Sequence, residues 1–134
     1  MTIAAVADTH TALWHLFGDP RLSSNASAFI DKAARQRQNI AISTISLAEL
    51  VYLVEKRRLA EAAYVELAKA IADPEHVFTE AVFTAAIVES MRKVPRAEVP
   101  DLPDRIIAAT AVHFGVPVIS RDRQILAANL KTIW

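Results

Sequence analysis

A chain of 134 residues has the size of one domain, and its 15 basic and 15 acidic residues leave it with no formal net charge. Zero net charge disfavours nucleic-acid binding through a broad basic surface, so any contact with RNA is expected to be local. The absence of cysteine excludes disulfides, thiolate nucleophiles and cysteine-based zinc sites, and the two isolated glycines cannot form a glycine-rich phosphate loop.

The chain is rich in apolar residues. They make up 53% of it. Such an excess is usually buried in one of two ways: in a sheet covered on both faces, or in a surface covered by another chain. Together with zero net charge, it leads us to expect a homodimer. No apolar run approaches the roughly 18 residues that span a bilayer, and no basic segment typical of a signal peptide is evident. We therefore expect a single cytoplasmic domain over residues 1–134, outside the membrane.

The expected elements alternate between strands and helices. Apolar runs of strand-forming residues predict strands, and apolar residues at helical spacing between caps, Gly or Pro predict helices. In chain order they are a strand at 3–7, helices at 11–17 and 23–38, a strand at 39–43, helices at 46–57, 59–72, 79–93 and 104–114, and strands at 116–120 and 131–134. The alternation implies an α/β fold with a mostly parallel sheet covered on both faces.

Four acidic residues fall at the ends of these elements. Asp8 directly follows the first strand, and Asp122 lies two residues after the strand at 116–120. Glu49 and Asp104 each lie in the first turn of an expected helix. Because the carboxyl ends of parallel strands open onto one edge of a sheet, where ligands usually bind, we expect the four carboxylates to converge there.

Such a cluster suits a divalent cation. Crowded carboxylates repel one another and raise their own pKa values, and a hard cation with oxygen ligands relieves that repulsion. Carboxylate-held metals in nucleases orient a water, lower its pKa and stabilise charge on the phosphate during in-line displacement. The residue types therefore favour metal-dependent hydrolysis of a phosphodiester.

Each acid also has a simpler interpretation. Glu49 completes a capping box with Ser46, Asp104 favours the dipole of its helix, and Asp122 is placed as an N-cap. Asp8 is harder to explain in this way, because an acid that ends an apolar strand needs a reason to be there. The common placement of the four at one sheet edge is the stronger signal.

Four segments resemble the motifs of one family. Residues 6–14 (VADTHTALW) resemble the opening of PIN-domain proteins, specifically the VapC-like toxins of toxin–antitoxin pairs. Residues 43–50 (STISLAEL), 101–111 (DLPDRIIAATA) and 120–122 (SRD) are similar to the second, third and fourth acidic motifs of that family. Their order and spacing hold across the whole chain, so the resemblance is more specific than any one motif.

The resemblance implies a three-layer α/β/α sandwich, an endoribonuclease that depends on Mg²⁺ or Mn²⁺, a homodimer, and inhibition by a cognate antitoxin protein. It also implies that Asp8, Glu49, Asp104 and Asp122 are the catalytic and metal-binding residues. Asp101 is an additional acid, either a helix N-cap or an outer ligand of the metal site.

Neighbouring residues have open alternatives. Arg105, Arg121 and Arg123 flank two of the acids, where they either hold phosphates or balance the charge of the cluster. Trp14 either lines a groove for a partner or packs in the core. His10 stands where many PIN-domain relatives carry a small polar residue.

Three other protein classes share part of this pattern. An aspartate-nucleophile phosphatase needs a second Asp two residues after the first, where this chain has His10. A receiver domain needs adjacent acids near its N-terminus, and Asp8 has none. The serious alternative is a PIN-like scaffold that binds RNA or a protein partner without cleavage, and the presence of all four acids argues against it.

Overall fold

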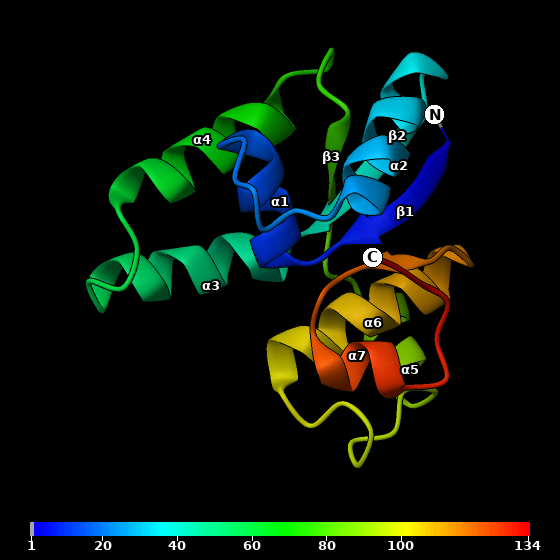
Figure 1. The fold of residues 1–134 in the computed structure, drawn as a ribbon. Helices are drawn as coiled ribbons and strands as arrows, with labels where there is room; N and C mark the ends of the chain where they lie inside the picture. The colour runs from blue at the N-terminus through cyan, green and yellow to red at the C-terminus, as the bar shows by residue number, and fades with distance from the viewer. Residues whose placement is uncertain (1) are drawn as a thin grey trace.

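The computed structural model describes residues 2–134, which fold around a parallel sheet with helices on both faces (Figure 1). The elements within residues 2–134 are β1 (Ile3–Ala7), α1 (Thr9–Leu16), α2 (Ser24–Arg35), β2 (Asn39–Ser43), α3 (Thr44–Glu55), α4 (Glu61–Ala72), β3 (Phe78–Ala81), α5 (Ala85–Met91), α6 (Leu102–Phe114), β4 (Val118–Ile119), α7 (Arg123–Ala127) and β5 (Thr132–Ile133). The strand order is β3-β2-β1-β4-β5, and every adjacent pair is parallel. The predicted α/β/α sandwich is confirmed.

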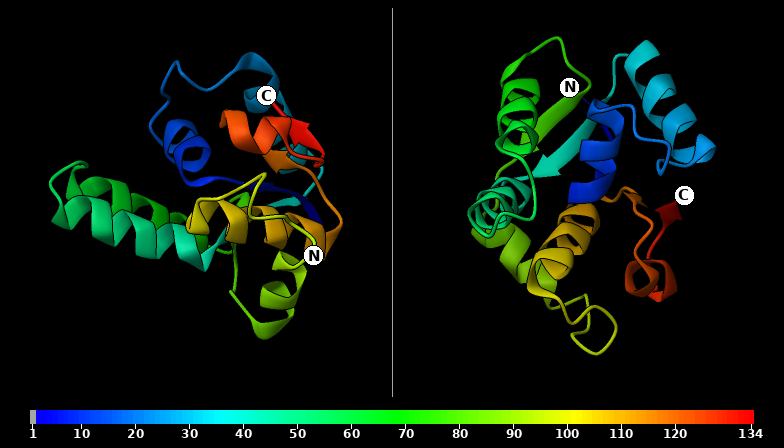
Figure 2. Two further views of the ribbon diagram at one scale, coloured as in Figure 1. Left: turned by 90° about the horizontal axis from the view of Figure 1, so that it is seen from below. Right: turned by 60° about the vertical axis from the view of Figure 1, so that its left-hand side comes forward.

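The sheet is buried on both faces because its strands direct alternate apolar side chains to opposite sides. Ala5, Ile40 and Phe78 pack on one face against α1, α2 and α4. Val6 and Ala41 pack on the other against α5, α6 and α7. The left view of Figure 2 shows α1 and α2 on one side of the sheet and α5 and α6 on the other. Double burial therefore accounts for much of the apolar excess in the composition.

One predicted helix is wrong over its first part. Residues 79–93 were expected to form one helix, but Phe78–Ala81 form the edge strand β3 and the helix α5 begins only at Ala85. The strand pairs in parallel with β2 from Ile40 to Ser43, and this long-range pairing decides the backbone conformation of a segment with mixed local preferences. Thr84 then caps α5, its Oγ1 accepting from Ile87 N at 3.4 Å.

The start of α3 also differs from the expected capping box. The helix begins at Thr44, and Ser43 is its N-cap, accepting a hydrogen bond from Ile45 N at 3.2 Å. Ser46 is therefore a buried residue within the first turn, and Glu49 lies one turn further along. The capping-box interpretation of Glu49 is wrong, because β2 runs directly into the helix and its last residue supplies the cap.

The other boundaries differ by a few residues. β4 and β5 are shorter than the predicted strands, with two residues each. Gly115 ends α6 in the left-handed conformation, with φ of 67°, which glycine adopts without strain. None of the helices within residues 2–134 is long and apolar enough to cross a bilayer.

Candidate active site

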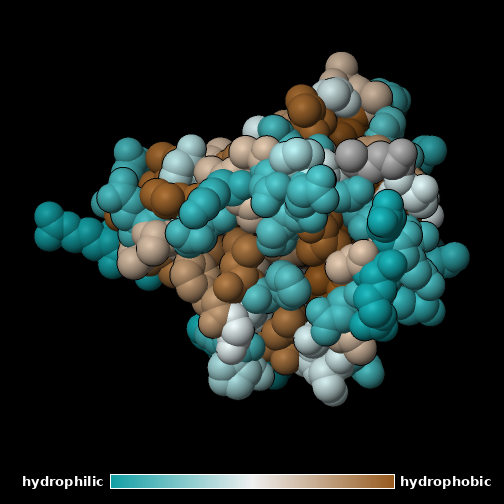
Figure 3. All heavy atoms as spheres, turned by 90° about the horizontal axis from the view of Figure 1, so that it is seen from above, coloured by the Kyte–Doolittle hydropathy of each residue, from teal (hydrophilic) through white to brown (hydrophobic). Residues whose placement is uncertain are grey.

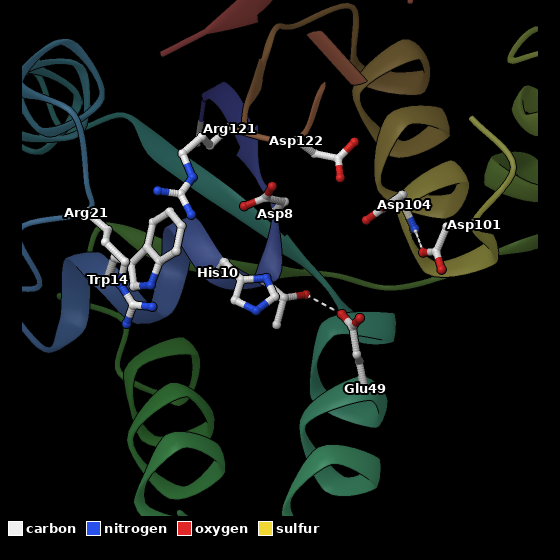
Figure 4. A pocket seen from close by; sticks show the side chains of 10 residues that line it. Asp8, His10, Trp14, Arg21, Glu49, Asp101, Asp104, Arg121 and Asp122 are labelled. Carbon is white, nitrogen blue, oxygen red and sulfur yellow. Dashed lines mark hydrogen bonds between the residues drawn. The ribbon is translucent and has the colours of Figure 1, made fainter. Parts of the chain in front are cut away.

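The four predicted acids lie at the carboxyl edge of the sheet, where they line one cavity of about 390 Å³ (Figure 4). β1 leads into Asp8 and β4 into Asp122, while α3 contributes Glu49 and α6 contributes Asp104. Asp101 lines the same cavity. Strand order explains this convergence: β1 and β4 are neighbours in the sheet, and α3 and α6 begin at the same edge.

Asp8 is held rigidly at the centre of the site. Its side chain is 8% exposed, and Oδ1 accepts from Thr11 N at 2.9 Å, which caps α1. The hydroxyl of Ser120, at the end of β4, donates to Asp8 Oδ2 at 2.5 Å. Ser120 Oγ also accepts from Asp122 N at 2.9 Å. One serine therefore connects the two acids that follow neighbouring strands.

Glu49 is oriented by a pair of buried hydroxyls. Thr9 Oγ1 lies 2.7 Å from Glu49 Oε1 and 2.9 Å from Ser46 Oγ. A carboxylate can only accept, so the single proton of the Thr9 hydroxyl is donated to Glu49 and the Ser46 hydroxyl donates to Thr9. This contact joins α1 to α3 and fixes the carboxylate at the cavity wall.

Asp122 and Asp101 each combine a place in the cavity with a cap. Asp122 Oδ1 accepts from Gln124 N at 2.9 Å and Ile125 N at 3.1 Å, so it is the N-cap of α7. Asp101 Oδ2 accepts from Asp104 N at 3.0 Å, which confirms its interpretation as the N-cap of α6. These bonds use one oxygen of each carboxylate and leave the other without a backbone donor.

Asp104 shows how crowded the negative charge is. Burial, and then the negative charges of the other cavity acids, raise its pKa from 3.8 to about 7. Within residues 2–134 the ion pairs join Arg21 to Asp19 and Arg92 to Glu89, so no basic side chain neutralises the cavity acids directly. Among the described residues, the cavity acids therefore take part in no ion pair.

This donor set fits a hard divalent cation. The carboxylate oxygens are the ligands that Mg²⁺ and Mn²⁺ prefer, and the raised pKa of Asp104 is relieved by positive charge. Among residues 2–134, no three His, Asp or Glu side chains are close enough to enclose a single ion.

The arginines next to the acids differ in their roles. Arg105 donates to Val94 O at 2.8 Å and to Met91 O at 3.0 Å, so it ties the segment after α5 to α6 instead of facing a phosphate. Arg123 is exposed and does not line the cavity. Arg121 does line it, together with Arg21. Sequence reasoning missed Arg21, because nothing near it in the sequence indicates that its loop reaches the site.

The match to a family model decides the identity of the fold. Residues 5–130 match the model of the PIN domain. This chain belongs to the PIN-domain family. It is 32% identical over 118 residues to Ribonuclease VapC22 of Mycobacterium tuberculosis, an alignment that covers 88% of this chain and 86% of that protein.

Solved structures share this PIN fold at low sequence identity. A VapBC2 structure from Rickettsia felis, bound to a promoter DNA fragment, has a TM-score of 0.69 at 18% identity, covering 97% of both chains. FitAcB from Neisseria gonorrhoeae has a TM-score of 0.60 at 18% identity, covering 96% of this chain and 95% of that one. A toxin–antitoxin complex from Klebsiella pneumoniae has a TM-score of 0.58 at 23% identity, covering 92% and 91%.

Proposed function

We propose that this PIN-domain protein is an endoribonuclease that requires Mg²⁺ or Mn²⁺ and acts as the toxin of a toxin–antitoxin pair. The observation that carries the proposal is the set of carboxylates that line one open cavity and form no ion pair among residues 2–134, which has the chemistry of a metal-dependent phosphodiesterase. The similarity to a ribonuclease over most of the chain supports RNA as the substrate. Asp8, Glu49, Asp104 and Asp122 are the proposed catalytic and metal-binding residues.

The side chains of the proposed site have different roles: some bind the metal and others orient the residues that bind it. Asp8 is immobilised by Thr11 N and the Ser120 hydroxyl, so its remaining lone pairs keep a fixed direction. Thr9 sets the position of Glu49 on the opposite wall. Asp104, with a pKa of about 7, holds a proton on part of the molecules at neutral pH and releases it when positive charge arrives. When bound, Mg²⁺ or Mn²⁺ supplies an activated water and charge stabilisation at the phosphate.

The solved structures with the same fold support the proposed antitoxin partner. The Rickettsia felis and Klebsiella pneumoniae structures contain toxins with their antitoxins, and the similarity of fold supports a protein inhibitor for this chain as well. Co-purification of this chain with the product of an adjacent small reading frame, followed by loss of nuclease activity in the complex, is the direct test.

We also infer that the protein is a homodimer. Large apolar side chains remain exposed beside β3 and on α5: Val82 is 60% exposed, Val88 49% and Phe83 36%. Figure 3 shows apolar side chains left exposed among hydrophilic ones on one face of the molecule. Exposed apolar surface of this kind is typical of protein–protein contacts, and a second copy of the chain is the partner that is always present.

The experiment that tests the enzyme proposal is cleavage of end-labelled, single-stranded RNA by the purified chain. We expect cleavage with Mg²⁺ or Mn²⁺, loss of cleavage in EDTA, and recovery when excess metal is restored. Undiminished cleavage in EDTA would contradict the metal mechanism. Metal binding without any cleavage would favour the alternative of a non-cleaving scaffold.

A further inference from the structure

A basic wall faces the acids across the cavity (Figure 4). It consists of His10, Trp14, Arg21 and Arg121, all of which line the cavity. The Cζ atom of Arg121 lies 4.6 Å from the centroid of the Trp14 ring, and that of Arg21 lies 5.1 Å from it. The His10 ring is 5.8 Å from the same ring. In Figure 4 the two arginines and Trp14 lie on one side of the cavity, Asp101 and Asp104 lie on the other, and Asp8 lies between them.

Charge balancing does not explain the position of Arg121. Arg121 is the sequence neighbour of Asp122, yet within residues 2–134 it forms no ion pair with any carboxylate. Its guanidinium instead stacks on Trp14, a cation–π contact that leaves the N–H groups at its edge available. An arginine placed to neutralise the cavity acids would contact them directly.

The wall is also held in place. Trp14 is only 7% exposed and packs edge-on against Trp134 at 5.8 Å, so it is a fixed support for the guanidiniums. Arg21 binds Asp19 through two bonds, Nε to Oδ1 at 3.0 Å and Nη2 to Oδ2 at 2.7 Å. Asp19 stays ionised, because hydrogen bonds from Arg21 lower its pKa to about 2. Both arginines are therefore oriented before any ligand arrives.

We propose that the basic wall is a phosphate subsite, in which Arg121 and Arg21 bind a backbone phosphate of RNA next to the one held at the acids. This inference rests on the proposed ribonuclease function. The chain has no net charge, so an RNA strand that enters an acidic cavity needs a local source of attraction. The planar guanidinium fits a phosphate better than a point charge does. A single-stranded polyanion spans both walls, whereas a small anion would occupy only one.

The test is single-turnover cleavage of a mixed-sequence RNA of about 12 nucleotides, with protein in excess, at about 50 to 200 mM salt. For Arg121→Gln and Arg21→Gln, we expect the protein concentration at half-maximal rate to rise about 3- to 10-fold. The slope of log affinity against log salt should become shallower by about 0.7 for each variant. The maximal rate should stay within about twofold, since the reacting phosphate is held at the acids.

Two further variants serve as controls. Arg92→Gln also removes an exposed arginine that pairs with a carboxylate, but Arg92 is the C-cap of α5 and lies outside the cavity lining. It should cleave RNA as the wild type does, with the same salt slope. Arg121→Lys keeps the charge and should keep the wild-type salt slope. Thermal melts of all variants confirm that they are folded.

The outcomes separate the two proposals. A wild-type chain that neither binds nor cleaves RNA would overturn the proposed function, and the subsite with it. The subsite alone would be overturned if the wild type cleaves RNA and the two variants, Arg121→Gln and Arg21→Gln, match it. The quantities compared are the protein concentration at half-maximal rate and the salt slope. Unchanged RNA parameters together with weaker binding of a hexaglutamate peptide would assign the wall to an acidic protein partner, again against the proposal.

Discussion

Asp104→Asn separates the chemistry of the site from the stability of the fold. Asn keeps the shape of the side chain but removes the negative charge, so we expect cleavage to be abolished. The same change should stabilise the metal-free protein at alkaline pH, because it removes one of several crowded charges. If Asp104 only supports the dipole of α6, the change should instead cost about 0.3 to 1 kcal/mol and leave the activity intact.

The expected stabilisation by Asp104→Asn follows from the pKa of Asp104. A native pKa of about 7, against 3.8 for the free side chain, means that the folded state binds the proton more tightly than the unfolded state. The contribution of Asp104 to wild-type stability is therefore most favourable at acidic pH and falls as the pH rises from about 4 through about 7. Three pKa units correspond to roughly 4 kcal/mol at most. Because Asp104 is partly exposed and solvent screens its charge, we expect about 1 to 2 kcal/mol.

The assay is a thermal melt in EDTA at several pH values, run beside the cleavage assay. Asp104→Asn should melt about 3 to 8 °C above the wild type near pH 8, and this difference should vanish towards pH 4. Asp101→Asn is the matched control for the helix cap, because Asn caps a helix about as well as Asp. It should stabilise the protein less than Asp104→Asn does, because it removes only the repulsion that Asp101 exerts on Asp104. An Asp104→Asn protein that is destabilised at pH 8 and fully active would refute the reasoning for this residue.

Three other outcomes are expected. Metal affinity should increase with pH, because binding displaces the proton that Asp104 holds at neutral pH. Calorimetry in buffers of different ionisation enthalpy should show that protons are released on binding. No proton release near pH 6 would count against a crowded acid cluster. Thr9→Val should weaken metal binding and cleavage about 3- to 10-fold, because Glu49 loses its hydrogen bond from Thr9. If the variant binds metal as tightly as the wild type, Glu49 does not need this hydrogen bond. Light scattering should give a dimer at micromolar concentration for the wild type, and Val82→Asp should shift it towards monomer; a monomeric wild type would refute the inferred homodimer.

Much of the fold and the convergence of the acids could be predicted from sequence, because both depend on regular patterns. Apolar runs fix β1 and β2, and a parallel sheet sends the residues after its strands to a common edge. Asp8 and Asp122 were expected at the same edge because each follows a strand, and the structure adds that these two strands are neighbours in the sheet.

The parts that could not be predicted depend on long-range contacts. β3 exists through pairing with β2, and local preference did not reveal it. Ser43 caps α3 because β2 continues into the helix without a loop, which left Ser46 and Glu49 free for other contacts. The guanidinium of Arg21 lies over the Trp14 ring at the cavity, and no pattern near residue 21 in the sequence indicates that this side chain lies close to the acids.

The bridge from Ser120 to Asp8 and Asp122 has a consequence for genetics. Ser120 is fully buried and lies behind the acids, yet its hydroxyl fixes Asp8 and accepts from the backbone of Asp122. If the protein is toxic to its host, selection for survivors should recover substitutions at Ser120 as well as at the acids. A survivor with Ala at position 120 would carry a correctly folded protein whose four carboxylates are all present but no longer aligned.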